Sequence, residues 1–115
     1  MRRCIVGLLL LAADPALACK CAVTSREQAI AATPLVFEGR ILGVVTIGTD
    51  QVTTVVVTRP IKGVSANVPL KVKSHTRSAA CGYDFRGMTT ATIGGEKAAH
   101  NTVTVRRCTM VNLNP

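Results

Sequence analysis

The cysteines near the N-terminus are the residues best placed to do chemistry. Ala16-Leu17-Ala18 has the small-x-small pattern that signal peptidase cleaves, and Cys19-Lys20-Cys21 follows at once. Cleavage after Ala18 would make Cys19 the first residue of the mature chain. The α-amine and the carbonyl oxygen of a first residue can bind one metal ion together. Such a terminus could occupy the open coordination position of a zinc ion held by another protein.

The segment before Cys19 has the order of an export signal. Two arginines open it, a ten-residue apolar run follows from Cys4 to Ala13, and the cleavage pattern comes last. The run is too short for a membrane span, which needs about 20 residues. We therefore predict a signal peptide over 1–18 and one secreted or periplasmic domain over 19–115. The alternatives are a buried helix and lipoprotein processing, which would place a lipid anchor on Cys19.

Cysteine usage agrees with export. Without the leader the chain keeps four cysteines, which are Cys19, Cys21, Cys81 and Cys108. An even number in a small exported domain indicates two disulfides, and a Cys19–Cys21 bridge would close a strained ring. Two pairings remain, and either closes loops of roughly 60 to 90 residues, worth on the order of 4 kcal/mol each. A four-cysteine zinc site is the alternative, although the paired Cys-x2-Cys spacing of such sites is absent.

A helix and several strands must position this terminus. Ser25 and Gln28 form a capping box that begins a short helix, and Pro34 ends it. Segments rich in Val and Thr then predict strands. The predicted strands are Leu35 to Ile47, Val52 to Ile61, Val68 to Ser74, Thr89 to Ile93 and Thr102 to Arg107. Gly94-Gly95 is predicted to begin the connection between the last two.

Five short strands and one helix predict a mostly β fold. We expect a small five-stranded barrel, closed or partly closed, with one short N-terminal helix. A small sandwich or an open sheet is the alternative. The chain has no Trp, one Tyr and two Phe, so its core must consist mostly of aliphatic side chains.

Several segments resemble the N-terminal domain of tissue inhibitors of metalloproteinases, a netrin-like module, and more closely its short bacterial relatives. These segments are Cys19-Lys20-Cys21-Ala22, the capped helix from Ser25 to Ala32, the strand from Val36 to Ile41, Ile61-Lys62-Gly63, the stretch from Ser78 to Tyr83, and Arg107-Cys108. The resemblance covers nearly the whole of 19–115. Its most specific motif is the Cys-x-Cys that directly follows the cleavage site.

The resemblance implies an OB-like barrel with bridges Cys19–Cys81 and Cys21–Cys108. It also implies an inhibitor that wedges its N-terminus into the cleft of a zinc metalloprotease. The amine and carbonyl of Cys19 would chelate the target's catalytic zinc. Lys20 would enter the main specificity pocket, with Cys21 and Ala22 in contact beside it. Animal inhibitors mostly carry Ser or Thr at the position of Lys20, and a lysine must keep its charge hydrated there.

The basic balance supports a second hypothesis. The chain has 14 Lys and Arg against 6 Asp and Glu, a net charge of +8 that becomes +7 without the leader's two arginines and one aspartate. Gathered on one face, these charges could bind an anionic envelope polymer or a membrane surface; scattered, they serve solubility. The residues concerned are Lys71, Lys73, Arg77, Arg86, Arg106 and Arg107.

No combination of residues predicts catalysis. His75 and His100 are the only histidines, and no serine or cysteine has an evident base. We therefore expect no enzyme, no cofactor and no intrinsic metal site. Nucleic-acid binding is not expected, because the aromatic residues are only Phe37, Tyr83 and Phe85 and the first should lie in the core. We expect a monomer whose partner is a zinc metalloprotease.

Overall fold

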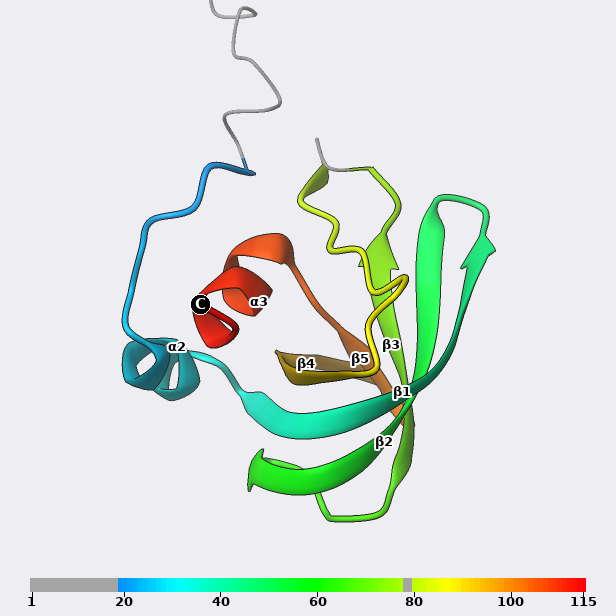
Figure 1. The fold of residues 1–115 in the computed structure, drawn as a ribbon, viewed down its shortest axis with the longest axis horizontal. Coiled ribbons are helices and arrows are strands. Elements are labelled where there is room, and N and C mark those ends of the chain that lie inside the picture. Colours follow the sequence, from blue (N-terminus) through cyan, green and yellow to red (C-terminus); the bar gives the residue numbers. More distant parts are fainter. Residues whose placement is uncertain (1–18, 78–79) are drawn as a thin grey trace, which may run out of the picture.

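The computed structural model describes residues 19–77 and 80–115. The predicted signal peptide and two residues of the stretch from Ser78 to Tyr83 lie outside the described residues. In chain order the elements are α2 (Arg26–Ala32), β1 (Leu35–Ile47), β2 (Asp50–Lys62), β3 (Pro69–His75), β4 (Thr90–Ala99), β5 (Thr102–Thr104) and α3 (Arg107–Leu113) (Figure 1).

The five strands close into a barrel in the order β1-β2-β3-β5-β4 (Figure 1). Neighbouring strands run antiparallel except β3 and β5, which are parallel. Register shifts on β1 between Glu38 and Gly39 and between Ile41 and Gly43 mark irregularities of the kind that lets a long strand bend. The prediction of a mostly β, five-stranded OB-like barrel with an N-terminal helix is therefore confirmed.

Aliphatic side chains dominate the barrel interior, together with the two phenylalanines. Phe37 and Phe85 are fully buried. Around them lie Val55, Val57, Val72, Ile93, Val103 and Met110. A smaller cluster of Ala29, Val36 and Leu113 packs the two helices against β1. Because both helices share this cluster, the two ends of the described chain lie against the same side of the barrel.

The N-terminal helix begins and ends as predicted. The backbone N–H of Gln28 donates to Oγ of Ser25 over 3.1 Å, and the backbone N–H of Ser25 donates to Oε1 of Gln28 over 3.1 Å. This reciprocal pair is a complete capping box. At the other end Thr33 donates its hydroxyl to the carbonyl of Ala29, and Pro34 follows. The helix thus has fixed ends although it is only seven residues long.

Two predictions about the C-terminal third are wrong. Gly94 and Gly95 do not begin a connection but lie within β4, where both are buried. A Cβ on Gly94 would overlap Leu113, and one on Gly95 would overlap the carbonyl of Thr104. The glycines therefore mark close packing rather than a turn. The fifth strand also ends at Thr104, well before the predicted end, and helix α3 follows it.

Candidate functional site

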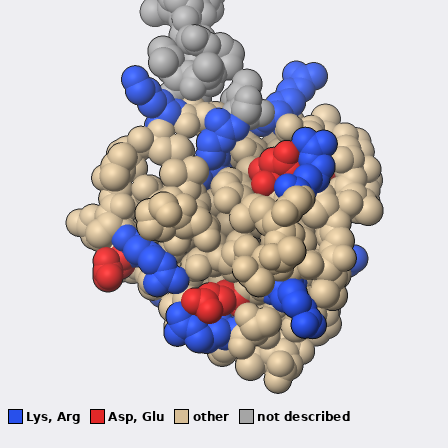
Figure 2. All heavy atoms as spheres, in the orientation of Figure 1, with Lys and Arg blue, Asp and Glu red and all other residues tan. Residues whose placement is uncertain are grey.

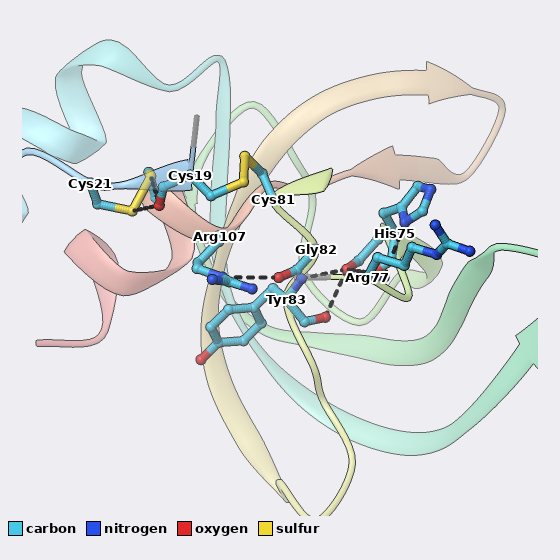
Figure 3. Close-up of a disulfide and its surroundings, with 10 residues drawn as sticks. Cys19, Cys21, His75, Arg77, Cys81, Gly82, Tyr83 and Arg107 are labelled. Atoms are coloured by element: carbon cyan, nitrogen blue, oxygen red, sulfur yellow. Dashed lines mark hydrogen bonds between the residues drawn. A yellow bond between two sulfur atoms is a disulfide. The ribbon is translucent and has the colours of Figure 1, made fainter. Parts of the chain in front are cut away.

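Two disulfides fasten the N-terminal segment to the barrel. Cys19 is joined to Cys81 and Cys21 to Cys108, each with a Cα–Cα separation of 5.1 Å (Figure 3). This is the pairing that the resemblance implies. The zinc-site alternative for the four cysteines is excluded, because a disulfide sulfur is not available as a thiolate ligand.

Exposure alternates along the fastened segment. Cys19 is 6% exposed, and Cys21 is half-buried. Lys20 and Ala22 are exposed, and Val23 is 94% exposed. The bridges therefore hold the two cysteines against the protein and leave the residues between and after them accessible to a partner.

The carbonyl oxygen of Cys19 lies over the second bridge. It is 3.4 Å from Sγ of Cys21 and 3.7 Å from Sγ of Cys108 (Figure 3). Because these two sulfurs are bonded to each other, they carry no hydrogen to donate, and both are close contacts rather than hydrogen bonds. The contacts place the backbone of the first cysteine directly against the bridge of the second.

The loop that carries Cys81 is held by backbone contacts. Cys81 has a φ of 64°, a left-handed conformation that is uncommon outside glycine. The next residue, Gly82, is buried, and its N–H donates to the carbonyl of Arg77 over 3.1 Å. A Cβ at this position would overlap the carbonyl of His75. The loop is thus packed directly against the chain that leaves β3.

Arg107 ties the same loop to the start of α3. Its backbone N–H donates to the carbonyl of Cys81 over 2.8 Å, and its Nε donates to the carbonyl of Gly82 over 3.2 Å (Figure 3). The neighbouring Cys108 bonds to Cys21. Both anchors of the N-terminus, Cys81 and Cys108, are therefore positioned by one short stretch of chain.

Asn112 is a contributor that the sequence interpretation missed. Its Nδ2 donates to the carbonyl of Ala22 over 3.1 Å, and its Oδ1 accepts from the backbone N–H of Thr24 over 3.3 Å. One side-chain amide thus holds the backbone of the segment on both sides of Val23. No local sequence pattern distinguishes Asn112 from Arg107 and Thr109, the other polar residues of α3.

A cavity of about 690 Å³ adjoins the site through Gly82 and Arg107. In its wall, Arg86 binds Asp84 over 2.8 Å, and Nε2 of Gln51 donates to the same carboxylate over 2.9 Å. These donors hold the pKa of the Asp84 carboxyl well below its usual range. The carboxylate stays charged and paired at neutral pH, so it is not suited to act as a general base there.

Tyr83 lines the same cavity with its ring against the core. Its ring centroid is 5.1 Å from that of Phe85, at an edge-on angle. Burial raises the pKa of the Tyr83 hydroxyl. With Phe37 and Phe85 fully buried, the aromatic side chains serve the core rather than an exposed stacking surface.

The basic residues gather only in part. Lys73 and Arg106 line one small cavity, and Arg86 and Arg107 line the larger one. Lys71 shares the outward-facing side of β3 with Lys73, and Arg77 is exposed in the loop after it. Asp50 and Asp84 offset two of these charges, at 3.5 Å from Lys73 and 2.8 Å from Arg86. Figure 2 accordingly shows basic groups spread over the visible face, several beside acidic ones.

The sequence matches no protein-family model and no curated protein. Within the described residues, no group of three or more His, Cys, Asp or Glu is arranged to hold a metal ion. Neither described helix has the length and apolar character needed to cross a membrane. Two disulfides are typical of a protein that folds in an oxidising compartment.

Proposed function

We propose that the chain, once cleaved before Cys19, inhibits a zinc metalloprotease with its N-terminus. The observation that carries the proposal is the double fastening of this segment. Cys19 and Cys21 are each bonded to the protein, and the residue between them is exposed. A segment that is ordered before binding loses little conformational freedom when it enters a cleft.

Cleavage supplies the group that the proposed chemistry needs. It converts the amide nitrogen of Cys19 into an α-amine, and such amines have a typical pKa of about 7.7–8.0, so a useful fraction is neutral at physiological pH. The neutral amine and the carbonyl oxygen of Cys19 together displace the water on the target's zinc. The sulfur of Cys19 takes no part, because it is bonded to Cys81.

Lys20 sets the choice of target in this proposal. It follows the chelating residue directly and is exposed, so it enters the pocket that adjoins the zinc. An ammonium group loses hydration in an apolar pocket at considerable cost unless its head stays in water or meets a carboxylate. The preferred protease therefore has a pocket that is acidic or water-filled at its end.

The decisive experiment moves the amine without disturbing the fold. Mature protein beginning at Cys19 is compared with protein carrying one extra alanine before it, on a panel of zinc metalloproteases. The extra residue displaces the amine from the zinc, so inhibition should be lost while the circular dichroism and the thermal melt stay unchanged. Acetylation of the amine should act in the same way, whereas Lys20→Ser should redistribute potency among the proteases.

Two results would remove the proposal. One is equal inhibition by the native and extended proteins, and the other is no inhibition of any protease in a broad panel. An intact mass with a diacylglyceryl group on Cys19 would also remove it, because the amine position would then sit at a membrane anchor.

The second candidate is a module that binds an anionic envelope polymer or membrane surface. It is favoured by the shared outward side of Lys71 and Lys73 on β3 and by Arg106 close to Lys73. Binding of this kind would survive the added alanine, weaken with rising salt and fall when both lysines are neutralised. The ion pair between Lys73 and Asp50 reduces the charge available for it.

A further inference from the structure

The cavity beside the loop that carries Cys81 is not used by the proposed inhibition. Its volume of about 690 Å³ lies within the range of about 300–1,000 Å³ that is typical of small-molecule sites. Arg107 lies in its wall at the start of α3, and Tyr83 and Val111 add an aromatic ring and an aliphatic side chain. A wall that combines a few charged groups with apolar ones is typical of a site for a small organic molecule.

The main hydrogen-bond acceptors in this wall are already occupied. Asp84 is the only acidic side chain among the described lining residues, and its carboxylate accepts from Arg86 and from Nε2 of Gln51. Oε1 of Gln51 accepts from a backbone N–H over 2.8 Å. The carbonyl of Gly82 accepts from Nε of Arg107 over 3.2 Å. A ligand that must donate hydrogen bonds therefore finds few free partners in this cavity.

Several donors in the same wall have unused hydrogens. The side chain of Arg107 donates only through Nε, so its two terminal nitrogens have no hydrogen-bond partner within the described residues. The hydroxyl groups of Tyr83 and Thr46 have none there either. Among the ion pairs of 19–77 and 80–115, none includes Arg107. The wall thus offers a positive charge without a counter-ion, together with free donors, to a ligand that brings acceptors.

Arg107 is positioned before any ligand arrives. Its backbone N–H donates to the carbonyl of Cys81, its Nε donates to the carbonyl of Gly82, and the next residue, Cys108, is held in a disulfide (Figure 3). Arg107 is also half-buried, so its charge is screened less by salt than that of an exposed arginine. A guanidinium that is already ordered loses little freedom on binding, and it can bind a carboxylate or a phosphate through two parallel hydrogen bonds.

We propose that this cavity binds a small organic anion, which is a carboxylate or phosphate group attached to an apolar body. The anionic group binds the terminal nitrogens of Arg107, and the hydroxyl of Tyr83 is available to donate to a further oxygen. The apolar body lies against Val111 and the ring of Tyr83. Binding at this site is independent of the proposed inhibition, because it involves neither the amine of Cys19 nor the side chain of Lys20.

Titration of the purified, disulfide-bonded protein with phenyl phosphate and with inorganic phosphate tests the site. A constant ionic strength separates binding at the cavity from the general attraction of anions to a basic chain. Calorimetry should show one site with a Kd between micromolar and millimolar, and phenyl phosphate should bind more tightly because its ring buries apolar surface. In NMR spectra of the same titration, the backbone N–H signals of Gly82, Arg107 and Val111 should shift the most.

Three variants assign the binding to the cavity. Arg107→Gln removes the charge that binds the anion and should weaken phenyl phosphate binding about tenfold or more. Arg106→Gln is the matched control, because it removes the same charge one residue earlier, from a side chain that lines other cavities. It should change the Kd by no more than about twofold. Val111→Glu leaves the loop untouched and adds a carboxylate to the cavity wall at a side chain that is 43% exposed, so it should weaken binding while the fold is kept.

Four results would overturn the proposal. The first is no binding of either probe at millimolar concentrations. The second is equal weakening by Arg106→Gln and Arg107→Gln, which would show a general attraction to the basic surface. The third is equal affinity for the two phosphates, because the apolar body would then make no contact. The fourth is binding to vesicles of anionic lipid without binding of phenyl phosphate, which would assign anion recognition to exposed residues such as Lys71 and Lys73 instead.

Discussion

Removal of the Cys21–Cys108 bridge should be among the most destabilising changes that leave the core intact. The two cysteines are 87 residues apart. In the chain-entropy model, a loop of this length restricts the unfolded chain enough to stabilise the folded state by about 4.6 kcal/mol at 25 °C. We therefore expect the pair Cys21→Ala and Cys108→Ala to lower the free energy of unfolding by about 4–5 kcal/mol.

Urea unfolding under oxidising conditions measures this loss. The m-value should rise, because the unfolded chain without the bridge exposes more surface. The pair Cys19→Ala and Cys81→Ala is the matched control. Its loop spans 62 residues, so the same model gives about 4.3 kcal/mol, nearly equal to the first. A loss below about 1 kcal/mol, with the m-value unchanged, would refute the entropic reasoning.

Three further predictions concern the core, the anchoring loop and acid stability. The Thr53 hydroxyl is fully buried and finds no hydrogen-bond partner within the described residues, so Thr53→Val should stabilise the protein by about 1 kcal/mol in urea unfolding. A decrease of about 1 kcal/mol in the free energy of unfolding would instead indicate that a buried water binds the Thr53 hydroxyl. Gly82→Ala should lower the free energy of unfolding by about 1–3 kcal/mol, because the new methyl group overlaps the carbonyl of His75. An unchanged free energy of unfolding would show that the loop can move to accommodate the methyl group. The lowered pKa of Asp84 contributes stability that is present above its unfolded pKa of about 3.9 and is lost as the pH falls toward the folded value. In Asp84→Asn, the free energy of unfolding should therefore fall less steeply as the pH is lowered below about 4. The same steepness as in the unmodified protein would contradict this prediction.

Local sequence signals predicted the first half of the fold well. The bounds of β1 agree residue for residue with the prediction, because its run of Val, Ile and Leu is bounded by Pro34 and by the turn at Gly48. The capping box of Ser25 and Gln28 likewise depends only on side chains within one turn of helix. The predicted starts of β2, β3 and β4, and the ends of β2 and β3, differ by one or two residues, as is usual for element boundaries, and the predicted start of β5 at Thr102 agrees.

The C-terminal third depends on tertiary contacts that no local pattern contains. Gly94 and Gly95 have the composition of a turn, yet they lie in β4 because Leu113 and Thr104 pack too closely for a side chain. Helix α3 has no side-chain cap at Arg106, so nothing in the sequence announces its start. Its stability comes instead from burial of Met110 and Leu113 and from its bridge to the N-terminus.

The candidate site shows the same division. The presence of two disulfides could be inferred from the even number of cysteines, and their pairing from the resemblance. The contact of Asn112 with Ala22 and Thr24 could not, because it joins residues some 90 positions apart. The lack of a second partner strand for β1 beyond Arg40, within the described residues, was also missed. It exists only because β4 pairs with β1 as far as Arg40 and no further, which is a property of the closed barrel.

The placement of the four cysteines sets a problem of order during synthesis. Cys19 and Cys21 leave the ribosome together, and Cys81 follows long before Cys108. When Cys81 becomes available, an oxidant of the compartment can join it to either early cysteine, and sequence distance hardly distinguishes the two. A Cys21–Cys81 bridge formed at this stage must be exchanged before the native pair can close. Cys19 and Cys21 can be told apart only after Arg107 and α3 have been made, because these position Cys81 and Cys108. Correct oxidation of this protein therefore depends on the segment from Arg107 onward, and a chain truncated before α3 would retain cysteines without the contacts that sort them.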